Sequence, residues 1–182
     1  MSKKIMTRNI AISGVTVALS LLCMLLGGII PLAEFTVPAI AGLILIPMVA
    51  ETGVKNGIYA YIVVTILSFF LVTNKEISFG FILFFGYYPI IKIFLDKLSN
   101  KFIKYFIKFL IFNLSFGIMY FLLALLFNIN IVESNYEKYS YIIITVIIIL
   151  GNIAFYLFDI TIARISYLYF TKYHHRVLKG RK

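Results

Sequence analysis

Six ionisable or amide side chains lie within long apolar runs of this 182-residue chain or at their edges, where they could do chemistry. They are Glu51, Lys92, Asn113, Asn152, Asp159 and Arg164. Such groups are costly inside hydrocarbon, and where they occur they mark substrate paths, proton relays or ion pairs. They are therefore the first candidates for a functional site, provided that the runs around them cross a membrane.

The position within each run separates these residues into two kinds. The four charged residues lie near run ends, where long side chains can extend to the interface. Lys92 and Asp96 are four residues apart and can pair along a helix. For the charged residues we expect a salt-bridge layer that ties helix ends together, in preference to transport chemistry. Asn113 and Asn152 lie deeper and could bond to each other, which we favour, or to a ligand.

The chain lacks the reactive groups that a membrane-embedded enzyme needs. Such an enzyme requires paired carboxylates, a metal-binding motif or a nucleophile with its base. No His-x-x-x-His or Glu-x-x-His pattern occurs, and the two histidines, His174 and His175, are adjacent in a basic tail. Cys23 is the single cysteine, so no internal disulfide can form. We expect no enzymatic activity, no metal and no cofactor.

A second polar set gathers at the opposite ends of the runs, where acids and amides alternate with Phe and Tyr. A mixed rim of this kind suits a small-molecule pocket. The same aromatic residues could instead form the ordinary belt of a membrane interface. With the deeper Asn152 added, the substrate-binding candidates are Glu34, Asn74, Asn128, Glu133, Tyr141 and Asn152.

The elements that position these residues are membrane spans. The chain is 62% hydrophobic and 13% charged, and its mean hydropathy of +1.02 excludes a soluble globule. Runs near the roughly 20 residues that cross a bilayer predict an all-α integral membrane protein, a bundle of six transmembrane helices. The runs cover residues 10–31, 35–50, 54–72, 77–95, 102–127 and 141–163.

Two of the predicted spans contain helix-breaking residues. The second run is short and holds Pro38 and Pro47, so it could re-enter the membrane without crossing it. In the fourth run, Pro89 removes a backbone donor and Gly86 lies one turn earlier, which predicts a kink. No Ser/Gly-rich linker separates the runs, so residues 1–182 are expected to form one membrane domain.

The basic residues predict an orientation. With six crossings, 15 of the 17 Lys and Arg residues fall on one side, and this excess is typical of the cytoplasmic side. We expect a multi-pass protein of the bacterial cell membrane with both termini in the cytoplasm. The net charge of +10 comes from short clusters between apolar runs, so a nucleic-acid partner is not expected.

The first run carries a strip of small residues, Ala11, Gly14 and Ala18, at helical spacings of three and four. Such a strip lets another helix backbone approach closely. With a basic N-terminus, six runs in about 180 residues and both ends inside, the chain resembles the substrate-binding S components of energy-coupling factor (ECF) vitamin transporters. The resemblance covers the whole chain in layout but only the first helix in motif.

The resemblance implies both a function and partners. In that family a small-residue motif in the first helix docks on a transmembrane T component that two ATPase subunits drive, and Gly14 and Ala18 would occupy the docking positions. The family binds its vitamin from outside, at the outer ends of the helices. The chain has no phosphate-binding loop of its own. The alternatives are an accessory membrane protein that binds no small molecule and a stand-alone secondary transporter.

Overall fold

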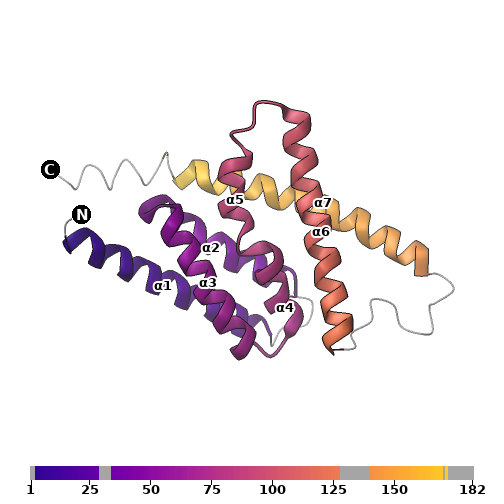
Figure 1. The fold of residues 1–182 in the computed structure, drawn as a ribbon, viewed down its shortest axis with the longest axis horizontal. Helices are drawn as coiled ribbons and strands as arrows, with labels where there is room; N and C mark the ends of the chain where they lie inside the picture. The colour runs from indigo at the N-terminus through magenta and orange to yellow at the C-terminus, as the bar shows by residue number, and fades with distance from the viewer. Residues whose placement is uncertain (1–2, 29–33, 128–139, 170, 172–182) are drawn as a thin grey trace.

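The computed structural model describes residues 3–28, 34–127, 140–169 and 171, and within these ranges the chain is helical without strands. Figure 1 shows α1, α2 and α3 on one side, α6 on the other and the α4–α5 segment between them, while α7 passes behind α5 so that its C-terminal end lies on the side of α2. The elements are α1 (Lys3–Gly27), α2 (Thr36–Thr52), α3 (Val54–Leu71), α4 (Lys75–Gly80), a π-helix (Phe81–Phe85), α5 (Tyr88–Leu95), α6 (Lys101–Phe127) and α7 (Ser140–Leu168).

Five segments of the described chain are long and apolar enough to cross a membrane, which fits a membrane-embedded protein. They are Met6–Gly27, Val54–Leu71, Lys75–Leu95, Lys101–Phe127 and Tyr141–Leu168. The remaining apolar helix, α2, has 17 residues and is about 25 Å long, short of the roughly 30 Å hydrocarbon core. The second run is therefore the short one, as expected, and six crossings stay a prediction.

Helix α2 runs antiparallel to α1 over most of its length. Near the C-terminal half of α1, the hydroxyl of the buried Ser20 donates to the backbone oxygen of Ala41 at 3.1 Å. Near the other end, Arg8 and Glu51 form an ion pair at 3.6 Å. The short helix thus extends from the C-terminal half of α1 back to its N-terminal turns.

At the predicted kink in the fourth run, the helix changes to π geometry over Phe81–Phe85 and passes through a turn at Gly86 and Tyr87 before α5. The N–H of Gly86 donates to the oxygen of Phe81 at 2.8 Å, which closes the wider π turn. Pro89 then stands in the first turn of α5, where its missing N–H costs nothing. The oxygen of Ile82 accepts a hydrogen bond of 2.7 Å from the Tyr61 hydroxyl on α3. A side chain of α3 therefore donates a hydrogen bond to a backbone oxygen of the π-helix.

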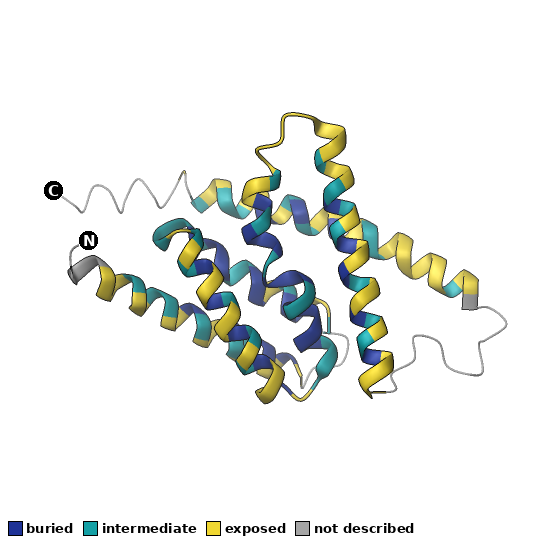
Figure 2. Ribbon diagram, in the orientation of Figure 1, coloured by how far each residue is buried: buried dark blue, intermediate teal, exposed yellow. Residues whose placement is uncertain are grey.

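The segment Lys75–Leu95, which contains α4, the π-helix and α5, lies at the centre of the molecule. In the most apolar stretch of Lys75–Leu95, 67% of the residues are buried, against 6% in that of α7, and Figure 2 shows this contrast. Helix α2 lies against the π-helix so closely that a Cβ on Gly42 would lie 2.1 Å from the oxygen of Phe85. The outer helices expose long apolar surfaces that fit contact with lipid.

Candidate functional site

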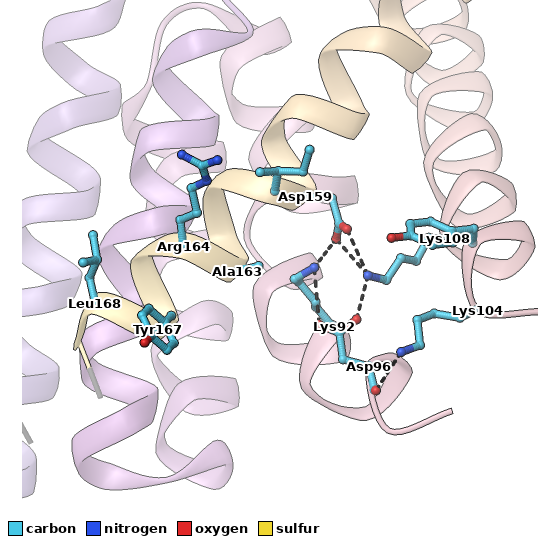
Figure 3. Close-up of a pocket in the computed structure, with 11 residues that line it drawn as sticks. Lys92, Asp96, Lys104, Lys108, Asp159, Ala163, Arg164, Tyr167 and Leu168 are labelled. Carbon is cyan, nitrogen blue, oxygen red and sulfur yellow. Dashed lines mark hydrogen bonds and ion pairs between the residues drawn. The ribbon is translucent and has the colours of Figure 1, made fainter. Parts of the chain in front are cut away.

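Four charged side chains, three of them buried, form a cluster where α5, α6 and α7 meet (Figure 3). The buried Tyr88 joins the cluster from α5. Lys92 contacts one oxygen of Asp159, and the hydroxyl of Tyr88 donates to the same oxygen at 2.6 Å. Nζ of Lys108 lies 3.0 Å from the other Asp159 oxygen and 2.7 Å from Oδ1 of Asp96. Lys92 also pairs with Asp96 at 3.3 Å. We call these four charged residues the ion cluster.

The ion cluster arises from helix positions. Lys92 and Asp96 are one turn apart, so they pair on one face at the end of α5, as their spacing predicts. Lys108 and Asp159 arrive from the two other helices. Lys92, Lys108 and Asp159 are at most 6% exposed, and buried charges need compensating partners. The two positive and two negative charges neutralise one another, and the ion pairs hold α5, α6 and α7 together. In this sense the ion cluster is a structural clamp.

Three of the four residues expected in a salt-bridge layer form ion pairs: Lys92 and Asp159 in the ion cluster, and Glu51 in a second contact. Glu51 pairs with Arg8 of α1 and accepts a hydrogen bond of 2.6 Å from Tyr169, just beyond α7. Burial, together with the bond to Glu51, raises the pKa of Tyr169 to about 12, so the phenol stays a donor at physiological pH. Arg164 has no ion pair among the described residues and points away from Asp159 (Figure 3), contrary to expectation.

Sequence reasoning missed Lys108, Tyr88 and Tyr169. Lys108 lies seven residues into α6, and the charge count treats it as part of a basic cytoplasmic cluster. Its position within an apolar run was a usable signal. Tyr169 carries no such signal, because a tyrosine near a helix end is common in membrane proteins. Tyr88 lies inside an apolar run among several other aromatic residues, so nothing in the sequence distinguishes it.

The two deep asparagines bond to each other, as we favoured. The amide nitrogen of Asn113 donates to Oδ1 of Asn152 at 2.9 Å, and the reverse bond is 3.1 Å. Each nitrogen also donates to the backbone oxygen four residues earlier in its own helix. Asn152 thus joins α6 to α7 in this structure, and its role in substrate binding stays a prediction.

At the opposite end of the molecule the structure brings two of the rim candidates, Glu34 and Asn74, together with Glu76. The amide nitrogen of Asn74 lies 3.3 Å from Oε1 of Glu34, and its Oδ1 caps α4 by accepting from the N–H of Glu76 at 2.9 Å. Asn74 therefore contacts both Glu34, through its side chain, and the backbone of Glu76. Tyr141 is 87% exposed in the first turn of α7. Asn128 and Glu133 lie outside the described residues.

The small-residue strip lies on the outer face of α1. Ala11, Gly14 and Ala18 are exposed, and a Cβ on Gly14 would meet nothing within 4 Å. The inner face is formed by Thr16, Ser20, Met24 and Gly27, which are buried. The strip therefore takes no part in the packing of the described helices.

Comparisons with protein-family models, with curated proteins and with solved structures gave no match to this chain.

Proposed function

We propose that this chain is the substrate-binding membrane subunit of an ECF-type importer for a vitamin or related micronutrient. In this proposal the chain crosses the membrane six times, with both termini in the cytoplasm. A small-molecule ligand binds at the rim around Glu34, Asn74, Asn128, Glu133 and Tyr141, with Asn152 as a deeper contact. The outer face of α1 docks on a T component, and two ATPase subunits supply the energy.

The exposure of the small-residue strip is the observation that carries this proposal. Transmembrane helices associate mainly through close van der Waals packing, for which small residues are suited. On α1 these residues face away from α2 and α3, and the space beside Gly14 is open. A partner helix could therefore approach the α1 backbone without any rearrangement of the chain.

The polar groups at the two ends of the helix bundle differ in kind, which supports a structural role at one end and ligand binding at the other. The ion cluster has its charges mutually paired, which suits a structural clamp. At the rim, Glu34, Asn74 and Glu76 converge from two different connections. Carboxyl and amide groups held together in this way offer both donors and acceptors to a polar ligand.

Co-purification from native membranes tests the proposed assembly. We expect the tagged chain to carry a T component and ATPases, identified by mass spectrometry, and Gly14→Leu and Ala18→Leu to lose them. The matched controls are Gly117→Leu on α6 and Ala154→Leu on α7, because both residues are exposed on other helices and a Cβ on Gly117 also meets open space.

Two results would contradict the proposal. A wild-type chain that brings down none of these subunits would remove the importer assignment. Strip variants that assemble as well as the control variants would show that α1 is not the docking face. Native mass spectrometry of the same preparation should also show a co-purified small ligand, and an accessory protein would carry none.

A further inference from the structure

A pocket of about 570 Å³ opens beside the ion cluster, between α5, α6 and α7 (Figure 3). Its lining contains four basic side chains, of Lys92, Lys104, Lys108 and Arg164, against the two acids of the ion cluster. Because the ion cluster is neutral within itself, the excess positive charge of the pocket comes from Lys104 and Arg164.

Neither of these two cations is neutralised by the described part of the chain. Nζ of Lys104 donates to the backbone oxygen of Asp96 at 2.9 Å, and no ion pair joins Lys104 or Arg164 to a described carboxylate. Figure 3 shows them on different helices, on opposite sides of the ion cluster. The arrangement favours an anionic guest that is larger than a single small ion.

The rest of the lining is apolar or aromatic. Ile160, Ala163 and Leu168 come from the last turns of α7, and the rings of Tyr105 and Tyr167 stand beside them. Both tyrosines are exposed, at 44% and 69%, and such amphipathic rings suit a boundary between lipid and water. A pocket with surplus positive charge and an apolar wall matches a molecule with a charged head and an apolar body.

We propose that this pocket binds the phosphate-bearing headgroup of an anionic lipid. Lys104 would contact the phosphate from one side of the pocket and Arg164 the headgroup oxygens on the other, since Arg and Lys are the usual phosphate-binding side chains. The apolar residues of α7 would contact the glycerol and the first acyl carbons. Basic pockets between membrane helices on the cytoplasmic side are typical sites for such headgroups. The site is independent of the proposed substrate rim and of the docking face on α1.

Native mass spectrometry of the full chain in detergent micelles tests this proposal, with phosphatidylglycerol, phosphatidylcholine and soluble glycerol phosphate added separately. We expect phosphatidylglycerol to bind more tightly than phosphatidylcholine. Lys104→Gln combined with Arg164→Gln should weaken phosphatidylglycerol binding roughly tenfold or more, the effect of two lost charges near a phosphate. Neither residue belongs to the ion cluster, so the fold should survive, and each single variant provides a milder version of the test.

The control is Lys97→Gln combined with Lys101→Gln, which removes the same charge from exposed positions outside the pocket. This variant should bind phosphatidylglycerol within about twofold of wild type, because its charges do not line the pocket. Equal losses in both double variants, or no loss in either, would overturn the proposal. Glycerol phosphate binding that depends on Lys104 and Arg164, without lipid binding, would overturn the lipid assignment and assign the pocket to a soluble phosphate ester.

Discussion

Asn113 on α6 and Asn152 on α7 exchange two side-chain hydrogen bonds of 2.9 and 3.1 Å. Each amide offers one carbonyl and one amino group to the other, so the pair is reciprocal. In lipid, hydrogen bonds between helices of this kind contribute to association because no hydrophobic force drives apolar helices together. The pair is thus a second connection between α6 and α7, separate from the ion cluster.

The first prediction concerns this pair. Asn113→Ala and Asn152→Ala should show a coupling energy of about 0.6–2 kcal/mol in a double-mutant cycle, measured by denaturation in detergent micelles. Thr145→Ala is the control partner, because among the described residues the Thr145 hydroxyl bonds within its own helix, to the oxygen of Tyr141 at 2.7 Å. Additive effects of the two asparagine replacements would show that the reciprocal bonds contribute nothing to stability.

The second prediction concerns the ion cluster. Asp159→Asn should lower the free energy of unfolding by about 3–5 kcal/mol, because two buried lysines lose a shared carboxylate. Asp96→Asn is the matched comparison and should cost less, since the Asp96 side chain is 42% exposed and water can screen the remaining charges. Thermal or chemical unfolding in micelles measures both. A smaller effect at Asp159 than at Asp96 would contradict the clamp.

The third prediction concerns orientation. In a Cys23→Ser background, a cysteine at position 76 or 135 should react with an impermeant thiol reagent added outside intact cells, and a cysteine at position 101 should not. The reason is the one-sided distribution of Lys and Arg. As a control, each of the three cysteine variants should react with the same reagent once the membrane has been disrupted. Outside labelling at position 101 alone would reverse the topology.

The fourth prediction concerns pH and the contact between Tyr169 and Glu51. Tyr169→Phe should lower stability by about 1 kcal/mol, the usual net value of one hydrogen bond. The pKa of the phenol in the folded protein, about 12, lies above the ordinary tyrosine value of 10.0. The difference between wild type and variant should therefore be constant from about pH 6 to pH 9 and should fall as the pH rises from 10 through 12. A difference that grows with rising pH would contradict this assignment.

Hydropathy predicted the location of the helices better than their ends. The predicted run 10–31 corresponds to α1, but α1 already begins at Lys3. The predicted run 141–163 corresponds to α7, but α7 continues to Leu168. An apolar run reports which residues prefer lipid, whereas a helix continues as long as backbone hydrogen bonds can form. Polar turns at the membrane surface are therefore helical without being apolar.

Within the candidate site, the predictable contacts were those with a local signal. Lys92 and Asp96 pair because their spacing places them on one helix face. Lys108 and Asp159 are 51 residues apart and come from different helices, so only the packing of α6 on α7 brings them together. The same holds for Arg164, whose direction depends on the rotation of α7 and not on its neighbours in the sequence.

The composition of the ion cluster has a consequence for synthesis and membrane insertion. Lys92 and Asp96 emerge from the ribosome together and can neutralise each other within one helix. Lys108 follows with α6, and the three residues of the ion cluster made so far then carry one uncompensated positive charge. Asp159 comes last, with α7, and restores neutrality. A chain that stops before α7 would hold a lysine without its carboxylate inside the bilayer, so the final helix completes the membrane domain electrically as well as sterically.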